Sequence, residues 1–155
     1  MKVLVFSDSH GRKELLDRII SNEPDCTEIV FLGDGMRDIE AVQEFYPKHR
    51  FTCVKGNNDW HSNKSGETYK YFNGVTVFAC HGDTLDVRTT VSYICRKAAA
   101  VGGKLALYGH THVAKSVIDP VTKVTAVNPG AACEGHYCVI EFLKGEFTVT
   151  HKTCW

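Results

Sequence analysis

The chain has 155 residues, which is the length of one domain and enough to bury a hydrophobic core without disulfides. Its 18 basic and 18 acidic side chains give a formal net charge of zero, which argues against strong nucleic-acid binding but not against a small phosphate ester. No apolar stretch reaches the roughly 18 residues of a membrane span, and the N-terminal apolar run is too short for a signal peptide. We therefore expect a cytoplasmic protein with no membrane partner.

The seven cysteines are scattered, odd in number and without a Cys-x-x-Cys pair. Several lie inside strand-like runs, where a free thiol acts as a small hydrophobic side chain. We expect all of them to be reduced and expect neither a disulfide nor a cysteine-rich zinc site. They are Cys26, Cys53, Cys80, Cys95, Cys133, Cys138 and Cys154.

The first half of the chain alternates strand and helix patterns. Short apolar runs at Val3–Phe6, Ile29–Leu32 and Phe51–Val54 predict buried strands. Between them, residues Arg12–Asn22 carry an apolar helical face, and a second such face runs from Met36 through Phe45 towards Pro47. A third helix is predicted at about Thr89–Val101. This alternation indicates parallel strands joined by right-handed crossovers.

The second half favours antiparallel hairpins, because pairs of alternating strands flank turn residues such as Asn73-Gly74. Parallel and antiparallel halves together predict mixed sheets, and two sheets stacked face to face with helices outside would satisfy both. The predicted pairs are Thr68–Phe72 with Val75–Cys80, Val113–Ile118 with Val124–Val127, and Tyr137–Leu143 with Glu146–Thr150.

Five apolar runs each end in a cluster of residue types that bind metals. Because ligands collect at the carboxyl ends of strands in open α/β sheets, the repetition predicts one convergent site, which we interpret as a two-metal centre. The clusters are Asp8 and His10, Asp34, Asn57 to Asp59, His81 after Val75–Cys80, and His110 and His112 after Leu105–Tyr108.

Each cluster has a plainer interpretation when it is taken alone. Asp-x-His and Gly-Asp are common turns, a Gly-Asn-Asn-Asp segment is rich in turn formers, and a single histidine after a strand is usually structural. The two histidines of Gly-His-Thr-His are the stronger indication, because two imidazoles at a strand end rarely serve packing alone. The set favours metal binding because all five clusters follow strands in one small domain.

The donor types indicate a particular chemistry. Mixed imidazole and oxygen ligands suit Mn²⁺, Fe²⁺, Co²⁺, Ni²⁺ or Zn²⁺ better than Mg²⁺ or Ca²⁺. Two such ions about 3.5–4 Å apart can clamp the attacking and leaving oxygens of a phosphoryl displacement, with a bridging water as nucleophile. No Ser-His-Asp or Cys-His arrangement competes with this mechanism.

The order of these motifs resembles the calcineurin-like metallophosphoesterase superfamily over residues 3–130. The short length and the Asn128-Pro129-Gly130 loop resemble its small YfcE-like phosphodiesterase branch. The resemblance implies a four-layer α/β/β/α sandwich of two mixed β-sheets flanked by helices, with a single metallophosphoesterase domain over residues 1–155.

The resemblance also implies a role for each ligand position. Two divalent transition-metal ions per chain are expected, with manganese favoured and nickel, iron, cobalt or zinc as alternatives. Asp34 would bridge the two ions. Asp8, His10 and His112 would hold the first ion, and Asn57, His81 and His110 the second.

Two further residues are candidates for catalysis. Many members carry histidine where this chain has Asn58, which can donate a hydrogen bond but cannot transfer a proton at neutral pH. This departure favours diesters or activated esters. Asp59 would either orient a ligand histidine or cap a turn of its own backbone. His61 is interpreted as lying away from the substrate.

The expected function is a binuclear metal-dependent phosphodiesterase that hydrolyses small phosphoesters through a metal-bridging hydroxide. A general phosphomonoesterase is the near alternative, and a non-catalytic scaffold resembling the retromer subunit on the same fold is the more distant one. All seven ligand positions carry ligand-capable side chains, which weighs against the scaffold. Specificity is expected in loops such as Trp60–Glu67 and Asp83–Arg88. The sequence leaves the physiological substrate, the native metal and the oligomeric state open.

Overall fold

The computed structural model describes residues 1–155 as two five-stranded sheets with three α-helices. The first sheet has the order β10-β9-β1-β2-β3, and its strands are β1 (Lys2–Phe6), β2 (Glu28–Phe31), β3 (Arg50–Cys53), β9 (His136–Leu143) and β10 (Glu146–Thr153). Strands β1, β2 and β3 pair in parallel, whereas β9 is antiparallel to both β1 and β10. The first sheet is therefore mixed.

The second sheet has the order β4-β5-β6-β8-β7. Its strands are β4 (Glu67–Phe72), β5 (Val75–Cys80), β6 (Leu105–Leu107), β7 (Lys115–Ile118) and β8 (Thr125–Asn128). Strand β6 pairs in parallel with β5 and β8, and the edge strands β4 and β7 are antiparallel to their neighbours. A short 3-10 helix, η1 (Ala132–Glu134), precedes β9.

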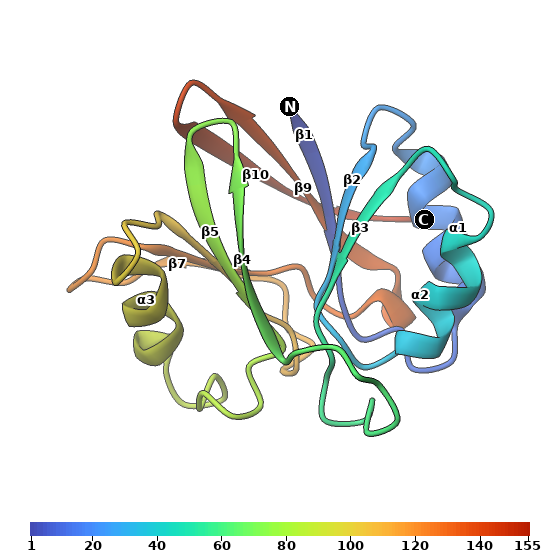
Figure 1. The fold of residues 1–155 in the computed structure, drawn as a ribbon, viewed down its shortest axis with the longest axis horizontal. Helices are drawn as coiled ribbons and strands as arrows, with labels where there is room; N and C mark the ends of the chain where they lie inside the picture. Colours follow the sequence, from blue (N-terminus) through green and yellow to red (C-terminus); the bar gives the residue numbers. More distant parts are fainter.

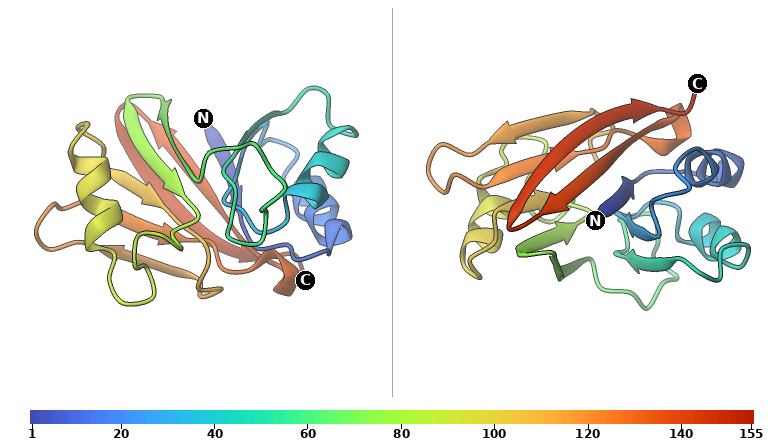
Figure 2. Two further views of the ribbon diagram at one scale, coloured as in Figure 1. Left: turned by 60° about the horizontal axis from the view of Figure 1, so that its bottom comes forward. Right: turned by 90° about the horizontal axis from the view of Figure 1, so that it is seen from above.

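The sheets stack face to face between helical layers (Figures 1 and 2). Helices α1 (Lys13–Asn22) and α2 (Met36–Gln43) cover the outer face of the first sheet, and α3 (Ser92–Ala99) covers that of the second. Strand β1 shows how the sequence builds these layers. Its residues Val3 and Val5 enter the cluster between the sheets, while Leu4 and Phe6 join the cluster under α1 and α2, as period-two alternation requires. The predicted four-layer sandwich is confirmed.

Most predicted element boundaries agree with the structure to within one or two residues. The prediction that the second helical face runs to Pro47 was wrong, because α2 ends at Gln43 and Phe45 is 79% exposed. The proline disfavours helical geometry at the residue before it, so the chain leaves the helix early. Helix α3 is also shorter than predicted.

The structure also tests two expectations drawn from composition, which concern the cysteines and membrane spans. All seven cysteines are free thiols, as predicted. No helix is both long and apolar enough to cross a membrane.

Candidate metal centre

The loops after β1, β2 and β6 hold several polar residues in an unusual backbone conformation. Asp8, His10, Asp34, His110 and His112 have φ values of 58°, 43°, 61°, 69° and 63°. Residues with a Cβ atom avoid this left-handed region, and strained backbone of this kind collects at functional sites. Five of the seven predicted ligands therefore stand at positions where the fold sustains local strain.

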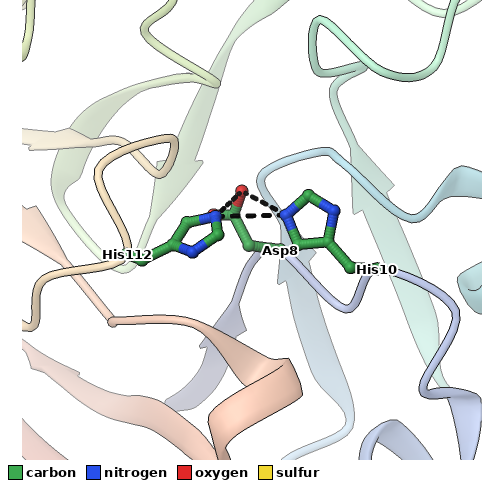
Figure 3. A group of neighbouring side chains, drawn as sticks. All are labelled: Asp8, His10 and His112. Carbon is green, nitrogen blue, oxygen red and sulfur yellow. Dashed lines mark hydrogen bonds and ion pairs between the residues drawn. The ribbon is translucent and has the colours of Figure 1, made fainter.

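The first cluster consists of Asp8, His10 and His112 (Figure 3). The Oδ1 atom of Asp8 lies 3.3 Å from Nε2 of His112 and 3.6 Å from Nε2 of His10, and the two Nε2 atoms are 3.1 Å apart. The other oxygen, Oδ2, accepts hydrogen bonds from the Ser7 hydroxyl and from the His110 backbone amide. One carboxylate oxygen is thus anchored and the other faces two imidazoles.

The Asp8 Oδ1 atom tests whether a metal fits this cluster. It is buried and has no hydrogen-bond partner. A buried polar atom without a partner costs free energy, so such atoms need an explanation, and an ion is one of the accepted explanations. An oxygen and two imidazole nitrogens converging on one point are donors that suit a transition-metal ion. The residues fit the implied cation.

The second cluster consists of Asn57, His81 and His110. The Oδ1 atom of Asn57 lies 3.0 Å from Nε2 of His81 and 3.1 Å from Nδ1 of His110. His81 is fully buried, and its Nδ1 donates to the Leu32 carbonyl at 2.7 Å, which leaves the lone pair of Nε2 facing the cluster. A lone pair opposite the Asn57 oxygen favours a proton or a cation between them. Fixing one ring nitrogen on a carbonyl also orients the imidazole as metal-binding histidines require.

Asp34 lies between the two clusters. Its Oδ2 atom is 4.0 Å from Nε2 of His10 and 3.4 Å from Nε2 of His81. Asn58 holds the carboxylate, because its backbone amide donates to Oδ1 and its side-chain amide donates to Oδ2, both at 2.9 Å. Burial alone would raise the pKa of Asp34, but His81 and the Asn58 hydrogen bonds lower it to about 2. The carboxylate is therefore ionised at neutral pH.

The carboxylates make the centre attractive to positive charge. Burial alone would lower the pKa of His81, but contacts with Asp34 and the charge of Asp8 raise it above its ordinary value. The pKa of His110 is lowered by burial and by the nearby His81 and Arg88. The carboxylates of Asp34 and Asp8 thus favour positive charge at His81.

The seven predicted ligand residues come together from both sheets. Asp8, His10, Asp34 and Asn57 follow strands of the first sheet, while His81, His110 and His112 follow strands of the second. The site therefore forms only where the two sheets meet.

Comparison with known proteins identifies the family. Residues 1–145 match the family model of the calcineurin-like phosphoesterase superfamily domain. The chain belongs to this superfamily. The resemblance inferred from the motifs is confirmed at the family level.

Three proteins illustrate what this chain of the calcineurin-like superfamily is similar to. Probable metallophosphoesterase YsnB of Bacillus subtilis (strain 168) is 26% identical over 132 residues, which cover 84% of this chain and 75% of that protein. The structure of a predicted phosphoesterase from Streptococcus pneumoniae has a TM-score of 0.82 at 21% identity, covering 99% of this chain and 89% of that chain. Vps29 from Entamoeba histolytica, solved with Zn²⁺, has a TM-score of 0.70 at 14% identity over 99% of each chain. The two structural similarities show the shared fold.

Asp59 lies beside the centre but does not contact a candidate ligand histidine, which was the first of the two roles expected for it. Its hydrogen bonds go to backbone amides and not to a histidine. Oδ2 accepts from the amides of Asp34 and Gly56, and Oδ1 from those of Gly35 and Met36. It does cap its own turn at Gly56, which was the second role expected for it. Two of the other amides belong to the loop after β2, and the third is that of Met36, the first residue of α2. Asp59 thus ties the Asp34 loop to the Asn57 loop.

A pocket of about 280 Å³ adjoins the centre. It contacts His10 and Asp34 of the metal clusters and Asn58 beside them. Arg37, Trp60 and His61 also line it, so His61 borders a space next to the site, while its predicted position away from the substrate stays a prediction. The sequence could not show that His61 borders this pocket, because nothing but its closeness to Asp59 along the chain pointed to the site.

Arg88 is a further residue that the motifs did not identify. Its Nε atom lies 3.2 Å from Nε2 of His110, and its guanidinium forms no ion pair with a carboxylate. The loop Asp83–Arg88 was expected to contribute to specificity. The contact between Arg88 and His110 was not expected, because 22 residues separate the two. Only the fold brings this unpaired positive charge to the rim of the centre.

Proposed function

We propose that this chain is a metal-dependent phosphodiesterase that hydrolyses small phosphoesters at a two-metal centre. The observation that carries the proposal is the buried, unpartnered Oδ1 atom of Asp8, which faces two imidazole nitrogens in a family of phosphoesterases. The carboxylate of Asp34, placed between both histidine clusters, supports a pair of ions over a single one.

The proposed ligands are those that the motifs imply. Asp8, His10 and His112 would hold one divalent ion, and Asn57, His81 and His110 the other, with Asp34 shared. We favour manganese, with nickel, iron, cobalt or zinc as alternatives. Bound there, two such ions lower the pKa of water and neutralise charge on a phosphoryl group.

Asn58 limits what the protein itself can contribute. Its side-chain amide already donates one hydrogen bond to Asp34 and also lines the adjoining pocket. An amide has no proton to transfer at neutral pH, so the chain supplies no general acid at this position. We therefore propose that substrates have good leaving groups, as in phosphodiesters of acidic alcohols and aryl esters.

Arg88 would add a positive charge beside His110, where it could contact the phosphate of the substrate. A guanidinium binds two oxygens of a phosphoryl group at once, and this one has no carboxylate to compete for it. Its place beside His110 puts it within a side chain's length of the ligands. We propose that Arg88 binds a non-bridging oxygen of the substrate phosphate.

Two other functions remain alternatives. A general phosphomonoesterase would use the same centre. A non-catalytic scaffold is the second alternative, because the fold is also that of Vps29. The structure of Vps29 from Entamoeba histolytica contains Zn²⁺. Because a protein of that kind can bind metal, metal content alone does not separate the two, and turnover must be measured. The seven free cysteines agree with a reducing compartment, and we propose a cytoplasmic location.

Elemental analysis combined with turnover of bis-p-nitrophenyl phosphate tests the proposal. Protein purified without chelator should hold about two transition-metal ions per chain, lose activity when it is stripped, and recover it with Mn²⁺. His112→Ala should lose metal and activity, whereas His151→Ala, an exposed histidine outside the centre, should keep both.

Three results would count against the phosphodiesterase. Metal without turnover of a mono- or diester would favour the scaffold. Faster turnover of p-nitrophenyl phosphate than of the diester would favour the monoesterase. Protein that binds no metal, with no gain of activity on adding metal, would rule out the centre itself.

A further inference from the structure

The pocket beside the metal centre has an exposed indole on its rim. The Trp60 side chain is 83% exposed, although tryptophan is a large apolar residue that folded proteins usually cover. Its ring meets that of His61 edge to face, with centroids 5.8 Å apart and planes at 85°. Most of the indole surface is thus open to a ligand, although one neighbouring ring contacts it.

The turn that carries Trp60 is anchored and is not a free loop tip. The preceding residue, Asp59, accepts four backbone hydrogen bonds from two loops. The amide of Ser62 closes the turn by donating to the Asp59 carbonyl at 2.9 Å. The indole is therefore presented from a fixed position next to Asn58 and the clusters, which reduces the ordering cost of binding a ligand against it.

Arg37 is a cation of the pocket that has no partner in the protein. The three acidic side chains that line it are already engaged, since Asp34 accepts from Asn58, Asp59 accepts four amides, and Asp38 accepts from Ser9 and Gly11. Arg37 has neither a carboxylate within 4.0 Å nor a side-chain hydrogen bond in the protein. A ligand in the pocket thus meets an unpaired guanidinium and an exposed indole.

We propose that this pocket binds the leaving group of the substrate, and that this group carries a flat aromatic ring with an anionic substituent, as a nucleotide does. The inference rests on the proposed function for the phosphoester bond at the clusters. The ring stacks on Trp60 and the anion pairs with Arg37. A volume of about 280 Å³ lies near the lower end for ligand pockets, which suits one small ligand and not a polymer.

Fluorescence titration of metal-loaded protein tests the assignment. The chain has two tryptophans, so Trp155→Phe leaves Trp60 as the only indole reporter. The probes are AMP, ribose 5-phosphate, which lacks the ring, and adenosine, which lacks the anion, with phosphate release checked so that AMP stays intact. AMP should quench Trp60 and bind about five- to 100-fold more tightly than ribose 5-phosphate. It should also bind at least about fivefold more tightly than adenosine.

Two variants assign these differences to their residues. Trp60→Ala, measured by calorimetry, should remove the advantage of AMP over ribose 5-phosphate, and Trp60→Phe should keep most of it. Arg37→Gln should remove the advantage of AMP over adenosine. Equal binding of AMP and ribose 5-phosphate, or discrimination that survives Trp60→Ala, would overturn the ring site. An unchanged AMP-to-adenosine ratio in Arg37→Gln would assign the anion to the metal centre and overturn the role of Arg37.

Turnover of bis-p-nitrophenyl phosphate by the same preparations separates this proposal from the proposed function. Hydrolysis without ring discrimination would overturn the pocket assignment and leave the phosphodiesterase intact. Ring discrimination without hydrolysis of any diester would support the pocket and count against the phosphodiesterase.

Discussion

At the scale of single residues, Asp34 is the side chain that contacts both histidine clusters. Its Oδ2 atom faces His10 of one cluster and His81 of the other, while Asn58 fixes both carboxylate oxygens. The low pKa of the carboxyl, about 2, keeps it charged throughout the neutral range. A single charge between two imidazole clusters is the arrangement that a shared ligand requires.

Asp34→Asn tests this sharing. We expect the variant to bind less than half of the normal metal and to lose more than about 100-fold in diester turnover, since even indirect partners of a metal site cost 10–100-fold. Elemental analysis and the turnover assay measure both. Asp38→Asn is the matched control, because Asp38 lines the same pocket but contacts only Ser9 and Gly11. Two metals and normal rates in Asp34→Asn would rule out a shared carboxylate.

At the scale of elements, the loops after β2 and β3 meet without room for side chains. A Cβ atom on Gly33 would lie 2.4 Å from the Gly56 amide nitrogen, and one on Gly56 would lie 2.1 Å from Oδ1 of Asp34. Asp59 fastens the same two loops through their amides. Close approach of the two backbones is what brings Asn58 onto the Asp34 carboxylate.

Gly56→Ala should therefore disrupt the centre. The added methyl group must displace Asp34, and we expect a loss of about 1–3 kcal/mol in the free energy of unfolding, as for overpacked sites, together with weaker metal binding. Urea unfolding and metal titration measure the two effects. Gly66→Ala is the control, because a Cβ there meets only the Lys55 carbonyl oxygen at 3.9 Å. If both variants were equally stable and bound metal equally, the close approach would not matter.

At the scale of the whole molecule, free thiols are buried in every layer of the core. Cys26 and Cys138 lie on opposite sides of the first sheet, and Cys80 of β5 packs in the cluster that holds Cys95 of α3. Burial raises the pKa of Cys26, Cys53 and Cys95 to about 11, from an ordinary value of 9.0, and raises those of Cys80 and Cys138 as well. The folded chain therefore keeps protons that the unfolded chain releases.

This difference predicts a loss of stability in alkali. Because the unfolded state binds fewer protons above about pH 9, the free energy of unfolding should fall as pH rises from about 9 to 11, by about 1.4 kcal/mol per pH unit for each such thiol. Urea unfolding in reductant and chelator measures the slope, and Cys95→Ala should make it shallower. Equal stability at pH 8 and pH 10 would contradict the prediction.

The sequence by itself determined the strands, the layers and the places of the seven candidate ligand residues at the strand ends. These follow from local pattern, because period-two alternation in runs such as Val3–Phe6 decides which faces are buried, and the residue after each run stands at the sheet edge. The family resemblance added the grouping of these residues into two metal sites. That grouping is still a proposal.

Only the tertiary structure decided the partners of residues outside those motifs. Asp59 binds amides more than 20 residues away, Arg88 reaches His110 across 22 residues, and Arg37 joins Trp60 and His61 in one pocket. No periodicity marks such contacts, because they depend on how two sheets and their loops come together in space. Local sequence thus identified the candidate ligands, whereas the surroundings proposed to select the substrate arise from packing.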